Sequence, residues 1–101
     1  MLQHWVLMQL KNGVREGDLA NLCKCVDSLP KKIPGVVCAS AGSELYALDK
    51  KRYDFGILIL FEDERALNTY PSHPYHRYMA DNYVHPMRKG DLQVFDCSIQ
   101  E

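Results

Sequence analysis

The chain has 101 residues, of which 47% are hydrophobic and 25% are charged, and its formal net charge is -1. This length and composition are typical of one folded domain, which we expect to cover 1–101. A net charge near zero predicts no basic surface for nucleic acid or for anionic lipid. The longest apolar run, 57–61, is too short to span a bilayer, and no signal-peptide pattern opens the chain. We therefore expect a cytoplasmic protein without a nucleic-acid or membrane partner.

The first half of the chain predicts a strand, a helix and a second strand. Residues 3–11 alternate, so that one face of this strand carries His4, Val6, Met8 and Leu10. Residues 17–30 carry apolar side chains at helical spacing, and Pro30 is expected to end this helix. Residues 36–41 predict the second strand, and a polar turn is expected around 50–52.

The second half predicts a strong strand followed by a helix in two pieces. Residues 53–62 form the most apolar segment of the chain. Asp63 is expected to cap the first helical piece, which Pro71 breaks, and Ser72 is expected to cap the second piece, which continues to 87.

A final strand at 92–99 completes the order β-α-β-β-α-β, which is the ferredoxin-like α+β motif with a four-stranded antiparallel sheet. Helices cover one face of such a sheet, and the other face is usually polar. Segment 53–62 is instead apolar on both faces. We therefore expect a second copy of the chain to cover the open face and form a dimeric barrel. A monomer with an exposed or ligand-filled face is the alternative.

The four cysteines, at positions 23, 25, 38 and 97, do not suggest a metal site. Cys23 and Cys25 are two residues apart on the expected helix, so their side chains point about 200° apart and cannot share an ion. In a cytoplasmic protein we expect all four to be reduced, structural thiols.

The chemically richest segment is 70–76, which contains Tyr70, His73 and His76. On a helix that turns 100° per residue, His76 shares the buried face with apolar neighbours, His73 lies about 60° from it, and His85 faces the opposite side. His76 is then either a hydrogen-bonded core histidine or a general acid or base. Tyr70 and His4 are candidates to join it.

A metal site is the competing use of the same histidines. His73 and His76 are three residues apart, and His4 is a possible third ligand. Their angular separation is wide, and no carboxylate or cysteine has ligand spacing beside them. We therefore expect no metal.

Several motifs together resemble the stress-responsive dimeric α/β-barrel (Dabb) family over almost the whole chain. These motifs are His4 at the start of the first strand, Ile33-Pro34-Gly35-Val36, Tyr53-Asp54-Phe55, Tyr70-x-x-His73-Pro74-x-His76 and Val94-Phe95-Asp96. The resemblance implies a ferredoxin-like protomer whose sheet packs against that of a partner. This agrees with the two-sided sheet expected from the alternation.

The family includes a plant polyketide cyclase that needs no cofactor. The resemblance to it implies an intramolecular aldol condensation of a poly-β-keto substrate, with His76 and Tyr70 as the acid–base pair. It assigns substrate binding to the residues His4, Val6, Met8, Val26, Ile57, Ile59 and His73. Cys23 and Val26 stand where the cyclase has aromatic residues, so the pocket is expected to differ in shape.

Two other functions remain open. One is a non-catalytic, stress-responsive dimer that binds a small ligand and uses His76 structurally. The other is a monooxygenase-like or ring-modifying enzyme on the same barrel, because one fold hosts many reactions. In addition, Pro74 fixes φ at a helix start, where His73 can bond nearby backbone.

Overall fold

The computed structural model describes residues 1–45 and 53–99, which follow the expected β-α-β-β-α-β order. The strands are β1 (Leu2–Met8), β2 (Val36–Ser43), β3 (Phe55–Phe61) and β4 (Gln93–Ser98). The helices are α1 (Glu16–Asp27), α2 (Leu29–Lys32), α3 (Glu64–Thr69) and α4 (Pro74–Met79). A 3₁₀ turn, Tyr70–Ser72, precedes α4, and a π-helical turn, Ala80–Val84, follows it. The polar turn expected around 50–52 lies outside the described residues.

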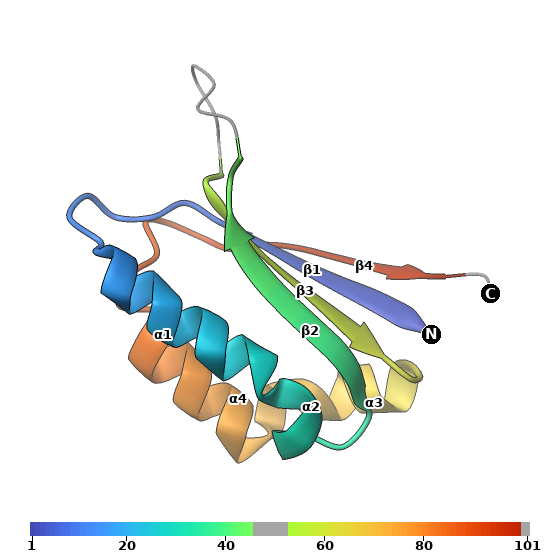
Figure 1. Ribbon diagram of the computed structural model, residues 1–101. Coiled ribbons are helices and arrows are strands. Elements are labelled where there is room, and N and C mark those ends of the chain that lie inside the picture. Colours follow the sequence, from blue (N-terminus) through green and yellow to red (C-terminus); the bar gives the residue numbers. More distant parts are fainter. Residues whose placement is uncertain (46–52, 100–101) are drawn as a thin grey trace.

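The four strands form one antiparallel sheet in the order β2-β3-β1-β4, which confirms the ferredoxin-like protomer. Figure 1 shows the helices on one face of this sheet and the other face uncovered. Strand β1 pairs with both β3 and β4, so His4 lies opposite Ile59 on one side and opposite Asp96 on the other. The sheet therefore gathers residues from the start, middle and end of the chain.

The hydrophobic core fills the space between the helices and the sheet. Along β3 the burial alternates, so that the side chains facing the helices are buried and those between them are partly exposed. The largest completely enclosed side chains are Met8, Leu22, Val26, Leu29, Ile59 and Phe61. Enclosing each of these contributes roughly 1.5–3 kcal/mol relative to an exposed side chain, so this layer holds the helices to the strands.

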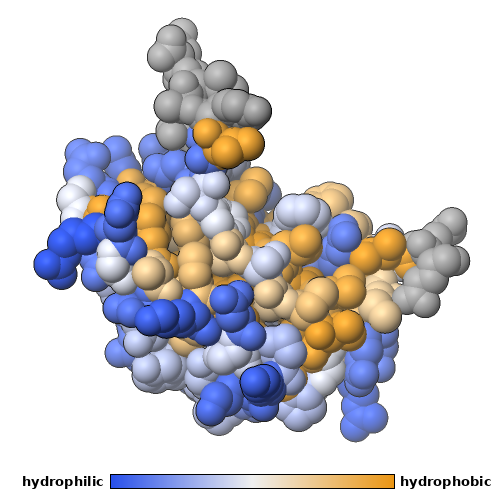
Figure 2. Space-filling model, in the orientation of Figure 1, coloured by the Kyte–Doolittle hydropathy of each residue, from blue (hydrophilic) through white to orange (hydrophobic). Residues whose placement is uncertain are grey.

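The open face of the sheet is apolar, as the alternation of the strands predicts. Trp5 lies opposite both Leu58 and Phe95 in the strand register, and paired residues of antiparallel strands share a face. Trp5 is 37% exposed and Phe95 is 61% exposed. Figure 2 shows hydrophobic residues gathered over the strands, while hydrophilic ones gather over the helices.

Two of the expected helix boundaries are wrong, one at Pro30 and one at Ser72. Pro30 does not end the first helix, because α1 ends at Asp27 and Pro30 lies in the first turn of α2, where its missing N–H is not needed. Ser72 does not cap α4. The cap is His73, whose Nδ1 accepts a hydrogen bond of 3.0 Å from the Tyr75 backbone N–H. His73 and Pro74 thus act as the helix-start device expected from the sequence.

The turn before β2 requires a glycine. Gly35 has φ of +87°, and a Cβ built on it would lie 2.4 Å from the Cβ of Ala66 in α3. Any other residue would strain the backbone and push α3 away from the sheet.

All four cysteines fall in the described part of the chain, and none of them forms a disulfide. No helix in that part is long and apolar enough to cross a membrane.

Candidate functional site

A cavity of about 120 Å³ lies between the sheet and the second helical segment. It is lined by His4, Val6, Ile57, Ile59, Tyr70, His76, Met79, Ala80, Val84, His85 and Leu92. A larger hollow of about 320 Å³ lies beside Lys11, Asn21 and Asn82, and its lining residues, all described, include no histidine. The chemistry-bearing side chains therefore converge on the smaller cavity.

Of the nine site residues predicted from the sequence, the cavity lining contains six, which are His4, Val6, Ile57, Ile59, Tyr70 and His76. The structure does not bring the other three to it. Met8 and Val26 are completely buried in the core, and His73 is used as the cap of α4. Two pairs of facing residues, His4 with Ile59 and Val6 with Ile57, form the sheet side of the cavity.

Tyr70 forms the buried end of the site, and only 3% of it is exposed. Its ring packs edge-on against Phe61 at 5.1 Å and against His4 at 5.9 Å between centroids. Its hydroxyl has no hydrogen-bond partner among the described residues. Every side-chain nitrogen or oxygen that is fully enclosed in those residues does have a partner, so the Tyr70 hydroxyl is not fully enclosed. The hydroxyl therefore opens onto the cavity.

The Tyr70 hydroxyl is a hydrogen-bond donor rather than a base. Burial raises the pKa of this phenol far above its ordinary value, and the nearby Cys25 thiol raises it further. Across the physiological range the group stays protonated and can donate a hydrogen bond to an oxygen in the cavity.

His76 lies against Tyr70, with the two ring centroids 4.4 Å apart. Its Nδ1 is 3.0 Å from the backbone carbonyl of Pro71. Because a carbonyl oxygen only accepts, Nδ1 carries the proton, and Nε2 keeps its lone pair. Burial lowers the pKa of His76, and the positive charges that His4 and His85 can carry lower it further, whereas the Pro71 bond and Asp81 raise it. The net result is a neutral imidazole with a basic nitrogen.

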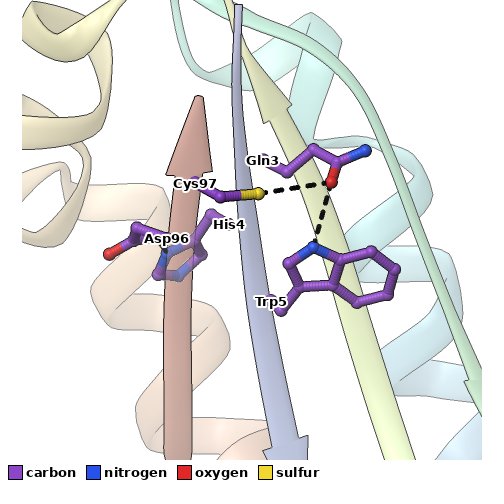
Figure 3. Close-up of polar contacts among 5 residues, drawn as sticks. All are labelled: Gln3, His4, Trp5, Asp96 and Cys97. Atoms are coloured by element: carbon purple, nitrogen blue, oxygen red, sulfur yellow. Dashed lines mark hydrogen bonds and ion pairs between the residues drawn. The ribbon is translucent and has the colours of Figure 1, made fainter. Parts of the chain in front are cut away.

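Asp96 is a site residue that sequence reasoning missed. Its carboxylate accepts a hydrogen bond from Nδ1 of His4. In Figure 3 the His4 ring lies beside Asp96, while Gln3 is joined to Trp5 and Cys97 by hydrogen bonds. The pairing follows from the register of β1 with β4, in which His4 and Asp96 are direct partners. Asp96 was part of the resembling motif, but a motif does not give strand register.

The expectation that His85 faces away from His76 is wrong. His85 lines the same cavity because the turn Ala80–Val84 is π-helical, with the His85 N–H bonded to the Ala80 carbonyl at 2.8 Å. An extra residue in a turn rotates everything after it, so angles counted at 100° per residue fail beyond this point. The lining residues Val84 and Leu92 were missed as well.

No group of three or more histidine, cysteine, aspartate or glutamate side chains suited to a metal ion occurs in residues 1–45 and 53–99. The cavity brings together the neutral imidazole of His76, the protonated phenol of Tyr70 and the ring of His4, which the exposed Asp96 carboxylate holds from outside the lining. This set can move a proton and stabilise a developing oxyanion.

The family model of the stress responsive A/B barrel domain matches residues 2–99. No curated protein matches the chain.

Solved structures share the fold along the whole chain. The protein At3g17210 from Arabidopsis thaliana is 22% identical, with a TM-score of 0.84 over 100% of this chain and 97% of its own. A dimeric ferredoxin-like protein of unknown function from Jannaschia sp. CCS1 is 26% identical, with a TM-score of 0.79 over 97% and 98%. The hydroxynitrile lyase from Passiflora edulis is 14% identical, with a TM-score of 0.80 over 99% and 94%.

Proposed function

The chain belongs to the stress-responsive A/B barrel family, and from this premise we propose that it is a cofactor-independent acid–base catalyst acting on a small carbonyl compound. One observation carries the proposal. The rings of Tyr70 and His76 lie 4.4 Å apart on one apolar cavity, with the imidazole neutral and the phenol protonated.

In the proposed reaction, Nε2 of His76 removes a proton from a carbon next to the carbonyl group. The C–H bond breaks, its electron pair moves into the enolate, and the Tyr70 hydroxyl donates a hydrogen bond to the enolate oxygen. The enolate carbon then attacks a second carbonyl of the same molecule, and the new alkoxide takes back the proton that His76 holds on Nε2. Loss of water from this aldol adduct completes the condensation. This is the intramolecular aldol condensation of a polyketide cyclase, and its reverse cleaves a carbon–carbon bond as a lyase does.

The size of the cavity favours a short substrate. A volume of about 120 Å³ is below the roughly 300–1,000 Å³ of pockets that enclose drug-sized ligands. A long poly-β-keto chain would need more room than this, whereas a compact carbonyl compound would not. That the fold is shared with a protein named a hydroxynitrile lyase is consistent with lyase chemistry on small molecules.

The remaining cavity residues are proposed to bind the substrate. Val6, Ile57 and Ile59 provide an apolar surface from the sheet. From outside the cavity lining the carboxylate of Asp96 orients the His4 ring, which leaves the second nitrogen of that ring for the substrate.

We also propose that two chains pair through the open face of the sheet. The row formed by Trp5, Leu58 and Phe95 is apolar and uncovered in the single chain, and a patch of this kind marks an association surface. Three of the solved structures with the same fold are described as dimeric ferredoxin-like proteins or as dimeric proteins of ferredoxin-like fold. Sedimentation equilibrium tests the pairing, and a mass near that of one 11.6 kDa chain at micromolar concentration would refute it.

A non-catalytic ligand-binding dimer is the second candidate. The small volume of the cavity and the bond between His76 and the Pro71 carbonyl favour it, because a structural histidine would be held in the same way. The monooxygenase-like alternative and the cytoplasmic location remain predictions from the sequence.

The deciding experiment follows deuterium exchange at the α-carbon of small ketones and β-keto esters by NMR. We expect the wild-type protein to accelerate exchange over buffer. His76→Gln should lower this acceleration by about 10²–10⁴-fold, and Tyr70→Phe by about 10²–10³-fold. The rate should level off by pH 7 and fall in acid, because only neutral His76 is a base and its pKa is lowered.

The chain offers matched controls for both variants. His73→Asn removes an imidazole outside the cavity and keeps a side chain that caps helices well. Tyr78→Phe removes a hydroxyl from an exposed ring on α4. Two results would favour the non-catalytic candidate. One is a wild-type exchange rate equal to that in buffer for every compound tested, and the other is an exchange rate that does not change between pH 5 and 8. Adding a polyketide synthase and its starter tests the cyclase form, through a shift from pyrones to a cyclised product.

A further inference from the structure

His85 is a third imidazole of the cavity, after His4 and His76, whose hydrogen atoms can be assigned from its partners. It lies nine residues after His76, so a regular α-helix would turn it about 180° away. The π-helical turn Ala80–Val84 brings it back to the cavity lining. His85 is exposed and lies at the mouth of the site, whereas Tyr70 is buried and lies at its inner end.

Arg88 determines which nitrogen of His85 carries the hydrogen. Its Nε–H donates to Nδ1 of His85 at 3.0 Å. A guanidinium has no lone pair to offer, so Nδ1 is the acceptor and the neutral ring carries its hydrogen on Nε2. The guanidinium is itself held by the Gly90 carbonyl at 2.6 Å and by the Asp91 carboxylate at 3.9 Å.

The imidazoles of His76 and His85 therefore have opposite tautomers. His76 donates from Nδ1 to the Pro71 carbonyl and keeps a lone pair on Nε2. His85 accepts at Nδ1 and keeps a hydrogen on Nε2. One ring is ready to take a proton, and the other is ready to donate a hydrogen bond.

We propose that His85 binds an oxygen of the substrate through its Nε2–H at the cavity mouth and that Arg88 is a positioning residue for this donor. The proposal rests on the function proposed above and narrows its substrate class. Tyr70 offers one donor at the inner end and His85 offers another at the mouth. The ligand that satisfies both is a small carbonyl compound with a second acceptor oxygen, such as a dicarbonyl or an oxygen-substituted ketone.

The tautomers can be measured directly in the free protein. Long-range ¹H–¹⁵N NMR distinguishes a ring protonated on Nδ1 from one protonated on Nε2. At pH 7.5 we expect Nδ1–H for His76 and Nε2–H for His85, and Arg88→Met should add an Nδ1–H population to His85 alone. Finding the Nδ1–H form of His85 in the wild type would overturn the proposal.

Binding of two matched probes tests the donor. Pentane-2,4-dione carries a second carbonyl that pentan-2-one lacks, and chemical-shift titration gives the dissociation constant of each. We expect His85→Phe to weaken dione binding by about tenfold, the value of one hydrogen bond, and to leave the monoketone unchanged. His85→Gln, which keeps an N–H donor, should restore most of the loss.

The outcomes separate this inference from the proposed function. Equal loss for both probes would mean that His85 acts by packing, and the inference would fail while the acid–base function stands. Dione binding no tighter than monoketone binding in the wild type would also refute it. Loss of exchange activity in His76→Gln reports on the function alone, because His76 does not donate to the second oxygen.

Discussion

The two faces of the sheet are built from alternating residues of the same strands, and they have opposite characters. On the helix-covered face, His4 and Ile59 are paired, and the polar groups meet in an enclosed cavity with defined partners. On the open face, Trp5 and Phe95 are paired and exposed. Side chains one residue apart on a strand point to opposite sides. Neighbouring residues of one strand therefore belong to different surfaces, and it is enclosure beneath the helices that separates the candidate chemical site from the association surface.

The largest expected difference between the faces is in stability. Ile59→Ala removes a side chain that is 1% exposed and should destabilise the fold by about 2–5 kcal/mol, because a void is left beside the cavity. Leu58→Ala, the neighbouring change on the open face, should cost much less in the separated chain. Urea unfolding at decreasing protein concentration measures both.

The dimer sharpens this test. If two copies cover the open face, the cost of Leu58→Ala should rise with protein concentration, while that of Ile59→Ala should not. Equal costs for the two variants at every concentration would remove the distinction between the faces.

A charge on the open face should break the association and spare the cavity. Phe95→Glu places a carboxylate opposite Trp5, and burying it without a partner should weaken pairing by at least about 10²-fold. Ser98→Glu is the matched control, because Ser98 lies on the helix side of the same strand, opposite Leu2. Sedimentation equilibrium should show monomer for Phe95→Glu and dimer for Ser98→Glu. Dimer for both would place the interface elsewhere.

A smaller effect is expected from the carboxylate on the covered face. Asp96→Asn keeps the size of the side chain but removes its charge, so the orientation of the His4 ring is weakened. We expect the α-carbon exchange rate to fall by roughly tenfold, about the value of one charge-assisted hydrogen bond. Asp27→Asn, which changes an exposed carboxylate outside the cavity lining, is the control and should leave the rate unchanged. A wild-type rate in Asp96→Asn would exclude His4 from the chemistry.

The sequence predicted the parts of this comparison that depend on alternation and helical spacing. The two-sided strand 53–62 and the inward position of His76 follow from those periods, because buried side chains repeat every two residues on strands and every 3.6 on helices. The meeting of Tyr70 with His76 came from the resemblance.

Other features escaped prediction for physical reasons. The pair of His4 with Asp96 depends on strand register across 92 residues of sequence, which local patterns do not encode. His85 was placed on the wrong side because one extra residue in a helical turn changes every later angle. Met8 shares a strand face with His4 and Val6, and Val26 lies on α1, but both are completely buried in the core, and packing is decided by three-dimensional neighbours.

The smallest expected effect is a pH dependence of stability that comes from the covered face. The pKa of His76 is lowered in the folded protein, mainly by burial, so the unfolded chain binds its proton more readily. Stability from this residue is therefore complete above the ordinary histidine pKa of about 6.5 and is lost as the pH falls toward the lowered value. Because the ring is partly solvated, the loss should be small.

Comparing variants isolates this contribution. Urea unfolding of the wild type between pH 7.5 and 5 should show stability falling more steeply than in His76→Gln, which has no proton to gain. His73→Asn, which changes the cap of the same helix and leaves His76 in place, should keep the wild-type slope. Equal slopes for wild type and His76→Gln would mean that burial does not lower the pKa of His76 in the folded protein.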